Sequence, residues 1–260
     1  MRILILGGTT EASALVRGLL PHPGLAVTLS LAGRTAKPAV EAVPTRVGGF
    51  GGAAGLARYL RDEAIDRLVD ATHPFAARIG RNAAEAAETA GVPLLAIRRP
   101  AWTPEPGDLW TEVDTVADCV AALGASPRRV FLTVGRMEVA AFATAPQHDY
   151  VVRTIEPLGD GLPVPRLTAI RARGPFDEAD EAVLMREAAI DVLVTKNAGG
   201  SATYGKIAAA RRLRLPVVIV RQPRKPAVAS VTDAAAALDR ILARAPNAAP
   251  PPHPCGRGSG

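Results

Sequence analysis

Residues 3–12 read ILILGGTTEA, a short apolar run that passes directly into two glycines and a polar turn. The run predicts a buried strand over Ile3–Leu6, and the following stretch predicts a helix over Glu11–Leu20. Glycines at such a turn let the backbone approach a phosphate, and the helix start adds unpaired N–H groups and a positive dipole end. The opening of the chain therefore predicts an α/β fold that begins with a phosphate-binding turn.

The same alternation of short apolar runs and Ala-rich helical stretches continues along the chain. It is typical of parallel sheets that are covered by helices on both faces. A stretch with three prolines, Pro100–Gly107, divides the alternation into two halves. We therefore expect two Rossmann-like domains with mostly parallel sheets and a ligand cleft between them. The N-terminal dinucleotide-binding domain would span 1–100 and the C-terminal domain 101–245, with a disordered Pro-rich tail over 246–260.

The composition excludes several classes of protein. With 48% hydrophobic and 22% charged residues among 260, the chain is not a disordered one. Cys119 and Cys255, its two cysteines, are too far apart for a metal-binding or redox spacing. No apolar run approaches the ~18–20 residues of a membrane helix, and the N-terminal run reaches glycines too soon for a signal peptide. These features predict a cytoplasmic protein without a membrane span.

The net charge of +6 is concentrated near the C-terminus, where residues 211–260 hold nine Lys or Arg and two acidic residues. Proteins that bind single-stranded nucleic acid interleave such cations with aromatic residues for base stacking. No aromatic residue lies among the cations of 211–225. The pattern therefore favours a polyanionic small molecule or a plain solvated surface over nucleic acid.

The glycine turn predicts a site for a dinucleotide cofactor, with a plain tight turn as the alternative. The full G-x-G-x-x-G spacing and a following G-K-[ST] are both absent, which argues against a Walker-type NTPase. After the strand predicted over Ala26–Leu31 the chain reads AGRT, with Arg34 in the region where NAD enzymes usually carry an acidic residue. An arginine there suits a 2′-phosphate and so favours NADPH, unless it is only a surface residue of a turn. The candidate cofactor-binding residues of these two stretches are Gly7, Gly8, Thr9, Thr10, Glu11 and Arg34.

Three further loops follow predicted strands, at the sheet edge where open α/β sheets bind ligands. The loop 70–76 reads DATHPFA and adds Thr72 and His73 to the cofactor candidates, although a histidine before proline can also be a simple turn residue. The loop 195–206 reads TKNAGGSATYGK and combines cations, an amide and a glycine pair that suit an anion, or it is a plain Gly-rich connection. With Arg136 from the third loop, the candidate substrate-binding residues are Arg136, Lys196, Asn197, Gly199, Gly200, Tyr204 and Lys206.

Hydrolytic chemistry has no support in the sequence. There is no G-x-S-x-G elbow, no H-E-x-x-H, no Cys/His cluster and no convincing carboxylate pair, so neither a catalytic nucleophile nor a metal site is predicted. A nicotinamide carries its own hydride and needs mainly orientation and electrostatics from the protein. The residues therefore favour a reductase.

Three segments together resemble the precorrin-6A reductase family of cobalamin biosynthesis: GGTTE at 7–11, DATHPFA at 70–76 and KNAGG at 196–200 with Lys206. RPAW at 99–102 and LPVVIVR at 215–221 add to the likeness, which covers roughly residues 1–240. The resemblance implies two Rossmann-like domains and an NADPH-dependent reduction of one macrocycle double bond, from precorrin-6A to precorrin-6B. It implies that the 7–11 loop faces the cofactor and that His73 and the 196–200 loop line the cleft, and it leaves open whether the macrocycle contains cobalt.

The chemistry of that substrate is consistent with these residues. A flat macrocycle fringed with carboxylates needs several Arg and Lys contacts around an apolar slot. Since an electron-poor macrocycle accepts a hydride with little acid catalysis, we expect no single side chain to be indispensable, and we assign no catalytic residue. Transient contact with neighbouring pathway enzymes is a further expectation. The alternatives are a two-domain nucleotide-sugar glycosyltransferase and a non-enzymatic protein that binds NADP or a tetrapyrrole.

Overall fold

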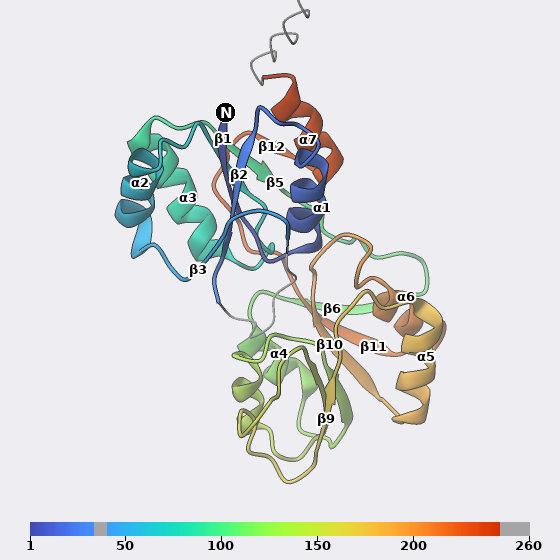
Figure 1. The fold of residues 1–260 in the computed structure, drawn as a ribbon. Helices are drawn as coiled ribbons and strands as arrows, with labels where there is room; N and C mark the ends of the chain where they lie inside the picture. The colour runs from blue at the N-terminus through green and yellow to red at the C-terminus, as the bar shows by residue number, and fades with distance from the viewer. Residues whose placement is uncertain (34–40, 245–260) are drawn as a thin grey trace, which may run out of the picture.

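The computed structural model describes residues 1–33 and 41–244 of the chain. Within these residues it contains two six-stranded parallel sheets, each covered by helices, and Figure 1 shows the two resulting lobes. The predicted pair of Rossmann-like sheets is confirmed. Arg34 and the predicted Pro-rich tail lie outside the described residues.

The first sheet is buried on both faces, which explains the unbroken ILIL run at its centre. Ile3 and Ile5 pack on one side against α1 (Thr10–Leu19) and α7 (Ala234–Leu242). Leu4 and Leu6 pack on the other side against α2 (Gly52–Asp62) and α3 (Ala77–Ala90). Side chains of a strand alternate between its faces, so a strand between two helix layers must be apolar at every position. The order is β12 (Ser230–Val231), β5 (Leu94–Ile97), β4 (Arg67–Asp70), β1 (Arg2–Leu6), β2 (Ala26–Leu31) and β3 (Thr45–Val47).

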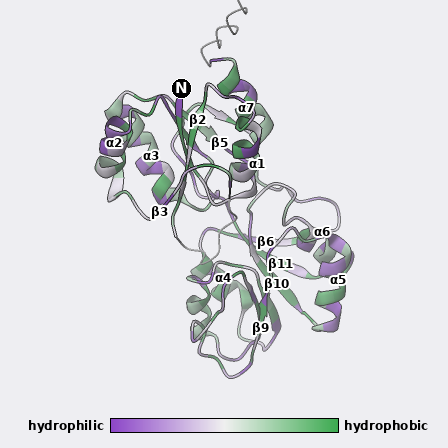
Figure 2. Cartoon of the chain, in the orientation of Figure 1, coloured by the Kyte–Doolittle hydropathy of each residue, from purple (hydrophilic) through white to green (hydrophobic). Residues whose placement is uncertain are grey.

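The second sheet repeats this plan. One face packs against α4 (Val116–Leu123) and the 3₁₀ helix η1 (Val139–Thr144), and the other against α5 (Glu178–Glu187) and α6 (Gly205–Arg212). Figure 2 shows hydrophobic residues along the central strands β10 and β11 of this sheet. The order is β6 (Leu109–Val113), β11 (Pro216–Val220), β10 (Val192–Lys196), β7 (Arg129–Leu132), β8 (Asp149–Thr154) and β9 (Leu167–Arg171).

The last strand and the last helix in the described residues return to the first lobe. β6 follows β5 in the chain but pairs with β11 of the second sheet, and β12 follows β11 but pairs with β5 of the first. The expectation that all of 101–245 belongs to the second domain is therefore wrong for β12 and α7. Hydrogen bonds from Ala96 N–H to Ala229 O and from Arg98 N–H to Val231 O fix β12 in the first sheet, and α7 packs on α1. As a result the chain crosses between the lobes twice, over 98–108 and 221–229.

None of the helices in the described part of the chain has the length and apolar character to cross a bilayer.

Candidate active site

The strand orders place a topological switch point in each sheet. It lies between β1 and β4 in the first sheet and between β7 and β10 in the second, because successive strands are added on opposite sides of these pairs. In open parallel sheets, ligands bind where the loops after such strands separate. The loops concerned here are 7–10 and 71–76 in the first lobe, and 133–138 and 197–204 in the second.

The turn after β1 is closed on its strand side and exposed on its helix side. A Cβ on Gly7 would lie 2.6 Å from Leu29 Cδ1, so a larger residue here would force the buried Leu29 side chain of β2 to move. Gly8 has φ +101°, is exposed, and no atom of the described residues lies within 4 Å of the position of its missing Cβ. Thr9 caps α1 by accepting a hydrogen bond from Ala12 N–H through its Oγ1. This turn therefore presents backbone N–H groups at a capped helix start, as a phosphate site requires.

The loop after β4 is tied to that turn. Thr9 Oγ1 donates to Ala71 O over 2.7 Å. Asp70 is fully buried and pairs with Arg98 over 2.8 Å, while Thr72 Oγ1 donates to the other carboxylate oxygen over 2.5 Å. Both loops of the first switch point are thus joined by hydrogen bonds and an ion pair within the first lobe.

His73 lies in this loop as a neutral imidazole. Its Nδ1 accepts a hydrogen bond from Phe75 N–H over 3.2 Å. Burial lowers the pKa of His73 to about 3, and the nearby cations Arg99, Lys196, Lys225 and Lys206 contribute to the same shift. At neutral pH this side chain therefore carries no charge and is a poor proton donor.

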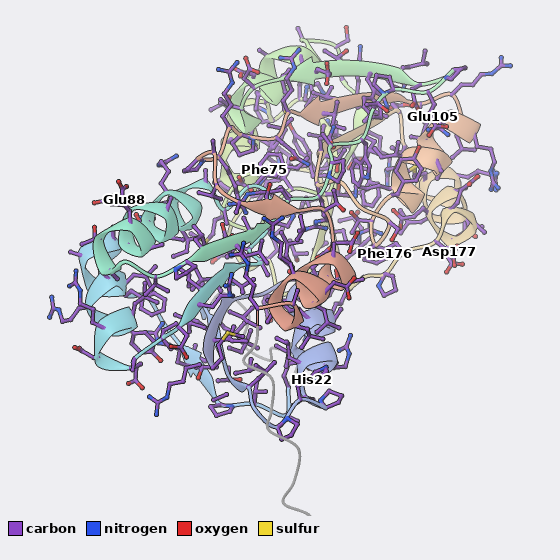
Figure 3. The ribbon with its side chains drawn as sticks, turned by 90° about the horizontal axis from the view of Figure 1, so that it is seen from above. His22, Phe75, Glu88, Glu105, Phe176 and Asp177 are labelled. Carbon is purple, nitrogen blue, oxygen red and sulfur yellow. The ribbon has the colours of Figure 1, made fainter. Side chains whose placement is uncertain are left out.

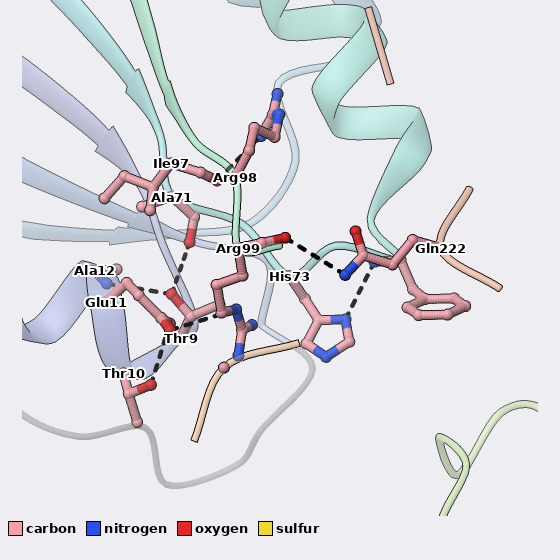
Figure 4. A network of polar contacts seen from close by, with 12 residues as sticks. Thr9, Thr10, Glu11, Ala12, Ala71, His73, Ile97, Arg98, Arg99 and Gln222 are labelled. Atoms are coloured by element: carbon pink, nitrogen blue, oxygen red, sulfur yellow. Dashed lines mark hydrogen bonds and ion pairs between the residues drawn. The ribbon is translucent and has the colours of Figure 1, made fainter. Parts of the chain in front are cut away.

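Arg99, the second residue after β5, links the two lobes. Its Nε lies 3.3 Å from Glu11 Oε1 in the first turn of α1 (Figure 4). Its Cδ lies 2.8 Å from the position that a Cβ on Gly200 would take, so Gly200 leaves room for it. Burial lowers the pKa of Arg99, and Glu11 partly opposes that shift. A guanidinium is thereby held at the start of α1 and beside the 197–204 loop of the other lobe.

The second switch point contains an ion pair between Lys196, at the end of β10, and Glu138, after β7. Glu138 Oε2 also accepts a hydrogen bond from Gly135 N–H over 3.1 Å. Lys196 Nζ lies 4.8 Å from the centre of the Phe75 ring, which comes from the first lobe (Figure 3). Arg136 is exposed on the same loop and donates to Pro157 O over 3.3 Å. The carboxyl ends of the two sheets therefore face one another across Phe75 and Lys196.

The Asn197 side chain forms its hydrogen bonds with the first crossover segment, residues 98–108. Its Oδ1 accepts a hydrogen bond from Trp102 N–H and its Nδ2 donates to Trp102 O, each over 2.8 Å. The Trp102 indole N–H donates to Gly200 O over 2.8 Å. Gly199, with φ +64°, lies so close to Pro100 that a Cβ there would be 2.2 Å from Pro100 O. The 197–200 loop thus holds the crossover segment in place.

Tyr204 and Lys206 also point toward this crossover. Tyr204 OH donates to Glu105 Oε1 over 2.5 Å and accepts from Arg211. Lys206 Nζ donates to Thr203 O over 2.8 Å and lies 5.2 Å from the Trp102 ring. Burial is the largest cause that lowers the pKa of Lys206 to about 7.

The structure therefore divides the predicted residues into two groups. Those at the facing strand ends are Gly7, Gly8, Thr9, Thr10, Glu11, Thr72, His73, Arg136, Lys196, Gly199 and Gly200. The side chains of Asn197 and Tyr204 instead bond to Trp102 and Glu105 of the first crossover segment, and Lys206 donates to the backbone carbonyl of Thr203. Sequence reasoning assigned no role to Phe75, Arg99 or Glu138. Arg99 could have been found from its position close to the end of a strand, two residues after Ile97, whereas Glu138 carried no such signal.

Comparisons with known proteins agree with this architecture. Residues 2–241 match the family model described as Precorrin-6x reductase CbiJ/CobK. A precorrin-6A reductase from Sinorhizobium sp. is 58% identical over 92% of each chain, and one from Rhodococcus erythropolis is 49% identical over 91% of this chain and 96% of that one. The solved structure of CobK precorrin-6A reductase has 43% sequence identity and a TM-score of 0.89, and covers 94% of this chain and 96% of its own.

Proposed function

Because the chain belongs to the CbiJ/CobK family of precorrin-6x reductases, and is thus a precorrin-6A reductase of cobalamin biosynthesis, we propose that NADPH is its hydride donor. We further propose that the cofactor binds at the first switch point and the tetrapyrrole at the second. The observation that carries this proposal is the contact between the two edges, where Phe75 of one lobe lies over Lys196 of the other.

The first switch point suits a dinucleotide. The pyrophosphate would lie at the start of α1, where Gly8 leaves room and Thr9 fixes the helix N-terminus. Arg99 would supply a positive charge next to it, since its guanidinium already lies beside Glu11 in the first helical turn. NADPH, when bound, supplies a hydride from its nicotinamide. Arg34 remains our candidate for the 2′-phosphate contact on sequence grounds alone.

The second switch point suits a polycarboxylate. Lys196 lies at the strand end and Arg136 is exposed on the neighbouring loop. Both would meet carboxylates at the rim of the macrocycle, because charge-assisted bonds to carboxylates are the strongest that side chains offer. Gly199 and Gly200 lie in the adjacent loop, where they allow the close approach of Pro100 and Arg99 and so keep the first crossover segment beside this edge. A small-molecule tetrapyrrole is thus the ligand that this edge favours. We also propose that the protein acts in the cytoplasm.

The protein assists the reaction through electrostatics. The same cations that lower the pKa of His73 would stabilise the negative charge that a macrocycle gains on accepting a hydride. His73 itself stays neutral at working pH, so we do not assign it the role of proton donor. This supports the expectation that no single side chain is indispensable for the hydride step.

The test is a labelled-hydride experiment on the wild-type protein. NADPH carrying deuterium at both C4 positions should transfer the label to precorrin-6B, because either face of the nicotinamide then delivers deuteride. We expect binding to favour NADPH over NADH, and Arg34→Ala to lose most of that preference, about 1–3 kcal/mol for a charge-assisted contact. Alanine variants at His73, Lys196 and Tyr204 should each keep most of the rate of the hydride step in single-turnover measurements. A loss near 10⁴-fold, about what one general acid supplies, would show that the substituted residue acts as an acid.

The alternatives give different results. A nucleotide-sugar glycosyltransferase would leave nicotinamide absorbance unchanged. A binding protein without activity would take up NADPH or the tetrapyrrole but transfer no label. Deuterium in the product excludes both, and unlabelled product formed in the presence of labelled NADPH would refute NADPH as the donor.

A further inference from the structure

Glu138 occupies a position in the second lobe where two hydrogen-bond donors converge on its carboxylate. Its carboxylate accepts from Gly135 N–H, the backbone amide at the β7 switch-point turn, and also pairs with Lys196 at the end of β10. These are two donors from the two strands that flank the switch point. A Cβ on Gly135 would lie 2.8 Å from Glu138 Oε2, so this glycine lets the carboxylate reach the turn.

The same position faces the cofactor lobe. Lys196 is 14% exposed and its Nζ contacts the Phe75 ring, whereas the Glu138 side chain is 37% exposed and lies on a loop with an exposed Arg136. Lys196 is therefore fixed at the junction, and Glu138 is the partner with a free path to solvent. A carboxylate that arrives from outside can replace Glu138 without moving the lysine.

We propose that Glu138 is an internal substitute for a substrate carboxylate, which occupies Lys196 and the Gly135 amide until the tetrapyrrole displaces it. Glu138 then determines specificity, because only a ligand with an ionised carboxylate at this point competes successfully for the lysine. It also lowers the affinity for substrate by the free energy needed to break the pair. This inference rests on the proposed function, since it assumes that the tetrapyrrole binds at the second switch point.

The substitution Glu138→Gln gives a test with a definite sign. It removes the charge but keeps a side chain of similar size. The dissociation constant of precorrin-6A, measured by absorbance titration without NADPH, should fall about 5-fold, as for loss of one partly exposed ion pair. Glu88→Gln is the matched control, since Glu88 is exposed on α3 (Figure 3) and its substitution changes the net charge by the same amount. The control should leave the dissociation constant within 2-fold of wild type, as expected of a distant screened charge.

A double-mutant cycle with Lys196→Met separates displacement from general repulsion of a polyanion. Lys196→Met should weaken tetrapyrrole binding, and in that background Glu138→Gln should change the constant no more than Glu88→Gln does. Weaker binding by Glu138→Gln alone would show that the glutamate merely positions the lysine, and would overturn the proposal. A 5-fold gain that persists without Lys196 would overturn it too. Failure of the proposed function would appear differently, as absent deuterium transfer from NADPH in the wild-type protein.

Discussion

Asn197→Ala separates two roles for a residue that the sequence suggests as a substrate ligand. In the structure its amide holds the main chain of Trp102 through two hydrogen bonds, and its side chain is buried, with 3% of the residue exposed. We therefore expect Asn197 to stabilise the crossover between the lobes rather than to bind the macrocycle.

The magnitude follows from the groups that the substitution leaves without partners. Truncation to alanine removes both bonds and strands the N–H and C=O of Trp102. At about 1–3 kcal/mol for each group left unsatisfied, the free energy of unfolding should fall by about 2–6 kcal/mol. With a urea m-value of about 3 kcal/mol/M, the midpoint should fall by about 1 M or somewhat more.

The assay is equilibrium unfolding in urea, with tryptophan fluorescence as one probe and circular dichroism as the other. Asn82→Ala, on α3, is the control and should change stability by less than about 0.5 kcal/mol. The tetrapyrrole dissociation constant is then measured under conditions where both variants are folded. If Asn197→Ala kept wild-type stability but lost substrate affinity, the assignment to the crossover would be refuted and the direct-ligand hypothesis restored.

Three further perturbations test single features of the site. The pKa of His73 is about 3 in the folded protein and near 6.5 in the unfolded chain, so the free energy of unfolding should fall as the pH is lowered from about 6.5 toward 3. His73→Asn should flatten the decline of the urea midpoint over this range, and an unchanged decline would contradict the lowered pKa. The pKa of Lys206 is about 7 in the folded state and near 10.5 in the unfolded chain, so the free energy of unfolding should rise with pH between these values. Lys206→Met should abolish that rise, as measured by urea unfolding midpoints at pH 7 to 10. Gly8→Ala should raise the NADPH dissociation constant about 5- to 10-fold, because φ +101° strains an alanine by ~1 kcal/mol and the added Cβ points into the space proposed for the pyrophosphate. An unaltered NADPH affinity in a fluorescence titration would show that this turn is not part of the cofactor site.

The sequence was a good guide where local patterns determine the structure. The ILIL run followed by two glycines predicted β1, the turn and α1, because a strand between two helix layers must be apolar throughout and a tight turn needs glycine. The rule that ligands bind at the carboxyl ends of parallel strands correctly placed His73, Lys196 and the 197–200 loop at strand ends. No pattern in the chain shows that the two sheet edges face each other.

The sequence was a poor guide where the structure depends on pairing between segments that are far apart in the chain. β12 reads only SV, has no continuous apolar run, and joins the first lobe's sheet although it follows β11 of the second. β6 reads LWTEV, also lacks such a run, and forms the edge of the second sheet beside β11. The role of Asn197 was hidden for the same reason, since its partner Trp102 is 95 positions away in the chain. Glu138 looks like an ordinary surface residue until β7 and β10 place it beside Lys196.

A crystal structure with NADP⁺ bound tests the central proposal most directly. We predict that the pyrophosphate lies at the start of α1, against Gly8 and Thr9, with the nicotinamide directed toward Phe75 and Lys196. A nucleotide bound instead on the 133–138 loop of the second lobe, with no anion at α1, would contradict the account.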